Sequence, residues 1–122
     1  MESVYDLYQR GCDLLDHGDH QAAIVPLSKA RELEPDKASI REALGRALFH
    51  SQRYERAAEE FGEIAARTPT NDYALFCLGR SMQMLGRHRE ACKPLALACS
   101  LRPERADYRL YRDRARRDAE RA

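Results

Sequence analysis

A histidine and two cysteines at helical spacing could begin a metal site. They are His88, Cys92 and Cys99, and a step of four residues places the first two on one side of a helix. Zinc needs four ligands, or three and a water molecule, and no neighbouring residue completes such a set. We therefore interpret these side chains as packed or partly packed groups and expect no metal.

Two further pairings could carry out chemistry. Cys12 and Cys77 would form a redox pair if the fold brought them together, and Cys12 with His50 would form a nucleophile and base. Nothing supplies an orienting carboxylate or an oxyanion hole for the second pair. The chain also has no CxxC pair, no glycine-rich phosphate loop and no HExxH motif. We expect a protein that is not an enzyme and that uses no cofactor.

Arginines crowd the last 17 residues. They could form a stripe that binds phosphate, so the alternative function is a protein that associates with RNA or the ribosome through this end. Four acidic residues interrupt the stripe and suit pairs along one helix, such as Asp113 with Arg117. We therefore favour a solvated helix and expect no nucleic acid partner. The arginines are Arg109, Arg112, Arg114, Arg116, Arg117 and Arg121.

The elements that must position these residues repeat every 34 residues. Prolines, glycines, alanines and large apolar residues each recur three times at this step. The columns are Pro35, Pro69 and Pro103; Gly11, Gly45 and Gly79; Ala23, Ala57 and Ala91; Leu27, Phe61 and Leu95; and Leu14, Leu48 and Met82. Such a period predicts an array of identical structural units.

Each column has a physical meaning. A glycine inside a helix costs roughly 0.5–1 kcal/mol relative to alanine, so its recurrence indicates that a second helix comes close. We expect the alanine column to supply the matching small surface, with the large apolar columns on either side. The prolines end one helical hairpin and precede the next.

Apolar residues recur at i, i+4, i+7 and i+8, which is typical of helices. This phase predicts first helices over 4–16, 38–50 and 72–84, and second helices over 20–33, 54–67 and 88–101. Ser3 and Asp6 predict a capping box for the first of them. Pro26 and Pro94 fall inside second helices at matching places, where the middle repeat has Glu60. No segment alternates with period two, so we predict no strand.

This pattern resembles the tetratricopeptide repeat family, whose 34-residue unit is a helix-turn-helix. The third repeat matches the family pattern with Leu75, Leu78, Gly79, Met82, Ala91, Leu95, Ala98 and Pro103. The first repeat departs from the family pattern at Arg10, and the second repeat departs from it at Arg41 and Ile64. The resemblance implies an all-α fold, a right-handed α-solenoid of three repeats with a seventh, capping helix.

We expect one domain over 1–122, with repeats at 4–37, 38–71 and 72–105 and the capping helix at 106–120. A terminal hairpin needs a cover for its apolar face. We expect Ala106, Leu110, Tyr111 and Ala115 to provide it, with Tyr108 partly packed.

The family's first helices line a concave groove, so the resemblance implies a binding surface there. We predict a protein–protein interaction scaffold or adaptor that binds a peptide or protein segment, because aromatic residues and arginines dominate binding energy at interfaces. Phe49 and Phe76 have a second interpretation, as packing between neighbouring repeats. The predicted groove residues are Tyr5, Tyr8, Cys12, Glu42, Arg46, Phe49, His50, Tyr73, Phe76, Cys77, Arg80 and Met84.

Some members of the family hold a terminal carboxylate with a clamp of lysine, asparagine and arginine. The matching positions here are Tyr8, Cys12, Ala43, Tyr73 and Cys77. None carries a cation or an amide, so charge-assisted hydrogen bonds to a carboxylate are missing. We therefore predict a groove without this clamp.

Composition indicates the cellular compartment and the source of the protein. The chain opens without a signal peptide and has no apolar run near the ~20 residues that span a bilayer, so we expect a cytoplasmic protein with its four cysteines as thiols and no membrane partner. Eighteen arginines against three lysines suggest a bacterial source.

Residues 1–37 carry a net charge of −4 and residues 72–105 a net charge of +3. This gradient predicts that copies can pair head to tail as a homo-oligomer.

Overall fold

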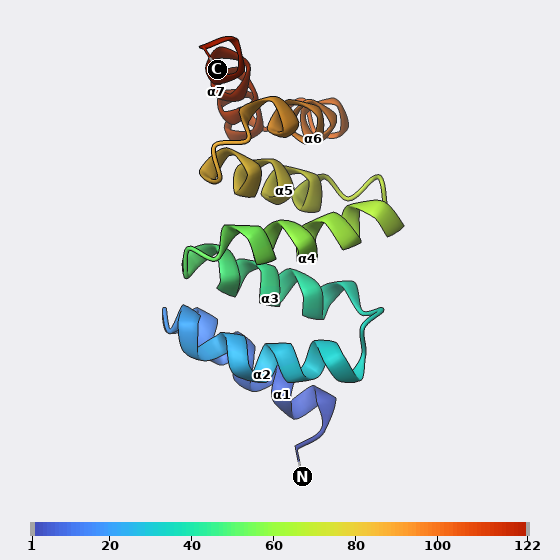
Figure 1. Ribbon diagram of the computed structural model, residues 1–122. Helices are drawn as coiled ribbons and strands as arrows, with labels where there is room; N and C mark the ends of the chain where they lie inside the picture. Colours follow the sequence, from blue (N-terminus) through green and yellow to red (C-terminus); the bar gives the residue numbers. More distant parts are fainter. Residues whose placement is uncertain (1, 122) are drawn as a thin grey trace. The chain divides into compact units, whose positions relative to one another are not determined.

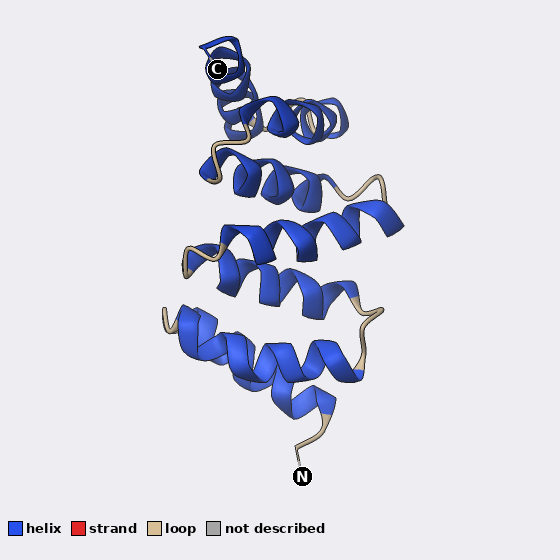
Figure 2. Cartoon of the chain, in the orientation of Figure 1, coloured by secondary structure: helices blue, strands red, loops and turns tan. Residues whose placement is uncertain are grey.

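The computed structural model describes residues 2–121, and in this range seven α-helices follow one another without a strand (Figures 1 and 2). The predicted all-α fold class is confirmed. The bounds of the six hairpin helices agree with those predicted, and the seventh extends one residue further than expected. The helices are α1 (Val4–Asp16), α2 (His20–Leu33), α3 (Ala38–His50), α4 (Tyr54–Arg67), α5 (Asp72–Met84), α6 (His88–Leu101) and α7 (Ala106–Arg121).

Contacts divide the chain into two compact units, and the division falls within α4. The first unit ends at Glu60 and the second begins at Phe61. In the first unit α2 packs against both α1 and α3, and in the second unit α6 packs against both α5 and α7. The prediction that 1–122 forms one domain stays a prediction. None of the helices within 2–121 is long and apolar enough to cross a membrane.

Local signals explain where the helices begin and turn. The Ser3 hydroxyl accepts a hydrogen bond from the Asp6 amide at 3.1 Å, and the Ser3 amide donates to Asp6 at 3.2 Å, which completes the predicted capping box. The Asn71 side chain caps α5 in a similar way. The turns within hairpins place Gly18 and Gly86 at φ of 81° and 76°, a region that favours glycine.

Two glycines of the repeated column lie where a second helix comes close. A Cβ atom at Gly11 would meet the side chain of Leu27 at 2.4 Å, and one at Gly79 would meet Leu95 at 2.5 Å. The expected close approach is therefore present. The leucine of the second helix, expected on either side, lies directly over the space that each glycine leaves, and the alanines Ala23 and Ala91 of the same helices are fully buried.

In the second unit, α7 covers α5 and α6 with one face. Tyr108 and Ala115 are fully buried and Tyr111 is half-buried. This corrects the expected covering set, because Ala106 and Leu110 are exposed, Leu110 by 50%. The helical phase explains the difference, since Tyr108, Tyr111 and Ala115 recur at i, i+3 and i+7.

The middle repeat departs from the pattern at two positions that form a buried ion pair. Arg41 replaces the apolar residue of the first helix and Glu60 takes the place of the prolines Pro26 and Pro94. Arg41 Nη1 lies 2.9 Å from Glu60 Oε1, and both side chains are nine-tenths or more buried. Arg31 reaches the second carboxylate oxygen at 3.2 Å.

We predict that the glycine contact limits the size of residue 79. Changing Gly79→Ala should lower the free energy of unfolding by about 1–3 kcal/mol, because the added methyl group overpacks against Leu95. Gly62→Ala is the matched control, since its Cβ would meet only Leu78 at an ordinary 3.8 Å. Urea denaturation measures both, and equal stabilities of the two variants would contradict the prediction.

We predict that Arg41 and Glu60 depend on each other. The single change Arg41→Leu should cost roughly 3 kcal/mol because it leaves the buried carboxylate with one partner. The double variant Arg41→Leu with Glu60→Met should recover most of this loss, since it restores an apolar pair. Glu63→Gln removes an exposed ion pair and should change stability by under about 1 kcal/mol. A double variant less stable than either single variant would disprove the coupling.

Candidate functional site

In the first unit, four of the predicted groove residues gather between α1 and α3. Tyr8 lies near Cys12 of its own helix, and Glu42 and Arg46 of α3 lie close enough to act on its charge. Burial raises the pKa of the Tyr8 hydroxyl, with smaller contributions from Cys12 and Glu42 that Arg46 opposes. The hydroxyl, which is protonated near neutral pH in any tyrosine, therefore keeps its proton to a higher pH than usual.

Aromatic rings cluster where α3 ends. His50 stacks on His20 of α2 with ring centroids 4.5 Å apart, and Phe49 meets the edges of His50 and Tyr54. His50 is exposed overall, yet the stack keeps water from one face of its ring. This loss of water is the largest cause that lowers the pKa of His50, and the charges of His20 and Arg46 lower it further. The ring is therefore mostly neutral near neutral pH.

A cavity of about 300 Å³ lies at the start of α1 and α3, and Tyr8 is among the residues that line it. Tyr5 stands at its edge with 70% of its surface exposed. Lys37 and Glu34, also at the cavity, form an ion pair at 3.4 Å. The full lining is Val4, Tyr5, Tyr8, Glu34, Lys37, Ser39 and Ile40. This volume is at the lower end of those that hold small ligands or single side chains.

In the second unit, the predicted aromatic residues of α5 are partly used in packing. Phe76 stacks on Tyr108 with centroids 4.6 Å apart and meets the edge of Tyr111 at 5.7 Å. Tyr73 meets the edge of Phe61 at 6.3 Å. Phe76 thus belongs to the contact between α5 and α7, which is the second of the two interpretations given for it.

The remaining predicted residues of α5 lie toward its end. The Cys77 carbonyl accepts a hydrogen bond from the Ser81 hydroxyl at 2.8 Å. Arg80 places its guanidinium 3.9 Å from the centre of the Tyr111 ring and donates to Gln83 at 2.9 Å. Met84 is 47% exposed. Arginine and methionine therefore face outward on this part of α5.

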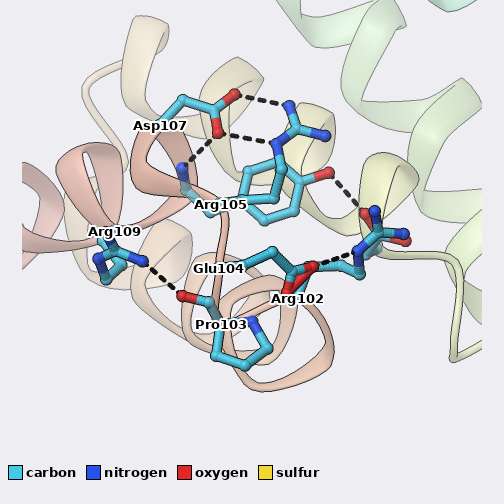
Figure 3. A network of polar contacts seen from close by, with 8 residues as sticks. Arg102, Pro103, Glu104, Arg105, Asp107 and Arg109 are labelled. Atoms are coloured by element: carbon cyan, nitrogen blue, oxygen red, sulfur yellow. Dashed lines mark hydrogen bonds and ion pairs between the residues drawn. The ribbon is translucent and has the colours of Figure 1, made fainter.

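A polar network holds the start of α7 against α5 (Figure 3). The buried Tyr108 hydroxyl donates to Asp72 at 2.6 Å. Burial is the main cause that raises the pKa of Tyr108, and this hydrogen bond raises it further. Arg105 lies 4.5 Å over the Tyr108 ring and forms a double hydrogen bond with Asp107. Arg109 donates to the Pro103 carbonyl across the same turn. The start of α7 is thus fixed by charge-assisted bonds as well as by packing.

Two residues that the sequence analysis did not assign to the site are Tyr111 and Arg114. The Arg114 guanidinium lies 5.0 Å from the centre of the Tyr111 ring that Arg80 also covers. A signal was present, because Arg46, Arg80 and Arg114 follow at 34-residue steps. The apolar residues of the last helix predict a cover for the third repeat, and that role alone does not reveal the recurring arginine.

The residues that could have carried metal or thiol chemistry lie in packing positions. The Cys92 thiol donates to the His88 carbonyl at 3.3 Å, and Cys99 is buried beside Leu75 and Tyr108. His88 lies 3.9 Å from Asp118 of α7. Within the described part of the chain, no three histidine, cysteine or acidic side chains are grouped as metal ligands would be.

Curated relatives match the chain over a small part of their own length. Superkiller complex protein 3 of Mus musculus is 27% identical over 96 residues, which is 79% of this chain and 6% of that protein. The Homo sapiens protein is 29% identical over 83 residues, 68% of this chain and 5% of that protein. The chain thus spans only a small fraction of these relatives.

Solved structures share the fold. MamA from AMB-1 superposes with a TM-score of 0.88 at 23% identity, covering 98% of this chain and 65% of that one. The first TPR domain of Spaghetti (RPAP3), bound to an HSP90 peptide, superposes with a TM-score of 0.88 at 16% identity, covering 96% and 93%. The C-terminal TPR domain of a Plasmodium falciparum putative FK506-binding protein gives 0.88 at 19% identity, covering 98% and 89%.

A family model described as tetratricopeptide repeat matches residues 8–72, more than half of the 122 residues. The chain therefore belongs to the tetratricopeptide repeat family and has the fold of a protein–protein interaction module.

Proposed function

We propose that the chain is an adaptor that binds a peptide or protein segment on the outward face of its first helices, α1 and α3 in the first unit and α5 in the second. The main observation is the exposed aromatic and arginine surface beside the cavity at Tyr5. Tyr5 at the edge of the cavity and Arg46 of α3 are both exposed, and Tyr8, which lines the cavity, lies near Arg46. Such residues give interfaces most of their binding energy.

A peptide partner suits the shape of this surface. The cavity of about 300 Å³ can accept one side chain of a bound segment, with Ile40 and Val4 at its apolar wall. Lys37 and Glu34 at its edge can exchange their exposed ion pair for hydrogen bonds to a peptide backbone at small cost. The RPAP3 domain of similar fold was solved with a peptide, which supports the same kind of partner here.

The arginines of α7 support a protein partner more than a nucleic acid. Arg112 pairs with Asp113 at 3.0 Å, and Arg105, just before the helix, pairs with Asp107 of its first turn at 2.7 Å. Acidic groups at this density would repel a phosphate backbone, whose binding depends on uncompensated positive charge. Head-to-tail pairing of copies stays a prediction.

We predict that Arg46 contributes to binding in the first unit. Peptides that bind the chain would be selected from a random display library, and their affinities measured by fluorescence anisotropy. Arg46→Glu should weaken the selected peptides about tenfold, because it reverses a charge at the centre of the surface. Arg56→Glu, an equal change on α4, should leave them within about twofold. A library that yields no binding peptide, or equal losses in both variants, would contradict the proposal.

We also predict that binding needs no terminal carboxylate. The clamp positions hold Tyr8, Cys12, Ala43, Tyr73 and Cys77, which offer no cation or amide. Each selected peptide should therefore bind equally well with a free or an amidated carboxyl end. A loss of about tenfold or more on amidation would show that another group holds the carboxylate.

A further inference from the structure

Tyr111 is a fixed aromatic platform at the contact between α5 and α7. Its ring meets Phe76 at 5.7 Å, and its backbone carbonyl accepts a hydrogen bond from the Gln83 side chain at 3.0 Å. Gln83 is buried, with 8% of its surface exposed. The backbone of Tyr111 is therefore held to α5 by Gln83, and its ring packs against Phe76 of the same helix.

Two arginines from different helices hold their guanidinium groups against this one ring. Arg80 of α5 lies 3.9 Å from the ring centre, and its Nη1 donates to the same Gln83 that bonds Tyr111. Arg114 of α7 lies 5.0 Å from the ring centre and is exposed. Within residues 2–121, Arg114 makes no ion pair. The aromatic ring reduces the freedom of both side chains before any partner arrives.

Two positive charges lie within 5.0 Å of the centre of one ring, and an anion beside that ring is attracted by both. A guanidinium presents planar N–H donors that match a carboxylate, and its fixed position lowers the entropy lost on binding. A carboxylate of a partner could accept hydrogen bonds from Arg114. The positive charge of Arg80 would also attract it. The geometry thus favours an acidic side chain over a neutral one.

Exposed apolar side chains flank the two arginines. Met84 follows Arg80 by one turn of α5 and is 47% exposed. Leu110 precedes Arg114 by one turn of α7 and is 50% exposed. Residues four apart share a face of a helix. A partner segment therefore meets positive charge at the centre and apolar contacts on both sides.

We propose that Arg80 and Arg114, held on Tyr111, bind an acidic peptide segment in which carboxylates alternate with apolar side chains. This deepens the proposed function and rests on it, because it names the chemistry of the segment that the second unit binds. The arginines lie outside the positions of the family's carboxylate clamp, so side-chain carboxylates serve as ligands and a chain end is not required.

The test uses a labelled, capped peptide in which glutamate alternates with leucine, and a second peptide with glutamine in place of glutamate. The glutamate peptide should bind the full chain about tenfold more tightly than the glutamine peptide, and added salt should weaken it. Arg114→Gln should remove most of this preference. Arg116→Gln is the matched control, because it removes the same charge from an exposed residue that lies on another side of α7.

Two further variants separate binding from folding. Arg80→Gln and Tyr111→Leu should also weaken the glutamate peptide, and thermal melting shows whether either loosens α7. Arg114→Gln keeps the inference testable if they do, since Arg114 is exposed. Equal losses in the Arg114 and Arg116 variants would overturn the inference, because they would indicate attraction by overall charge. A single-stranded oligonucleotide that binds more tightly than the peptide would overturn it in favour of a nucleic acid.

The two proposals can fail separately. If the glutamate peptide does not bind, while library peptides bind in a way that depends on Arg46, this inference is wrong and the adaptor function stands. If neither the glutamate peptide nor any library peptide binds, both are wrong. Binding of the glutamate peptide that depends on Arg114 supports both.

Discussion

The close contact between a glycine of one helix and a leucine of the next sets the geometry of the hairpins. At Gly11 and Gly79 any side chain would meet Leu27 or Leu95 well inside van der Waals distance. The helices can approach this closely only because the glycine has no Cβ, and the approach offsets the cost of glycine in a helix. The spacing of the first and second helices in these two hairpins follows from it.

One position of the repeat holds buried side chains of different chemistry in different repeats. Pro26 and Pro94 are buried inside second helices, and Glu60 fills the equivalent place in the middle repeat. A buried carboxylate is costly unless it is paired, and Arg41 provides the pair from a position where the other repeats have leucine. The two departures from the repeat pattern thus compensate each other. A buried ion pair also accepts fewer alternative partners than an apolar contact, which favours one register between the helices.

The sequence was sufficient to predict the helices but not the partners of individual polar side chains. Helix bounds follow from local signals, such as the capping box at Ser3 and the glycine at the turn position of Gly18, and these lie within a few residues of what they control. The pairing of Tyr108 with Asp72 joins residues 36 apart. Both occur as ordinary polar residues in the sequence, so only the packing of α7 reveals that they meet. The groove residues were placed through the family resemblance, and Phe76 shows its limit, because the same residue serves in packing.

Helix α7 matches the first helices of the repeats at some positions and departs from them at others. Its face toward α5 keeps the repeat's character, with the buried Tyr108 and Ala115. At the positions where the repeats place the packing residues for a following second helix, α7 has charged residues. Asp113 takes the place of the glycine column, and a side chain there would prevent the close approach of another helix.

The column of arginines that we propose for binding, in contrast, continues onto α7. Arg114 follows Arg46 and Arg80 at the same 34-residue step, although the packing columns around it have changed. Packing and binding positions lie on different faces of a first helix, so one can be lost while the other is kept. A helix that only covered the apolar end of the second unit would gain nothing from an arginine held against Tyr111. The retained arginine is therefore better explained by a role in recognition than by a role in the cover.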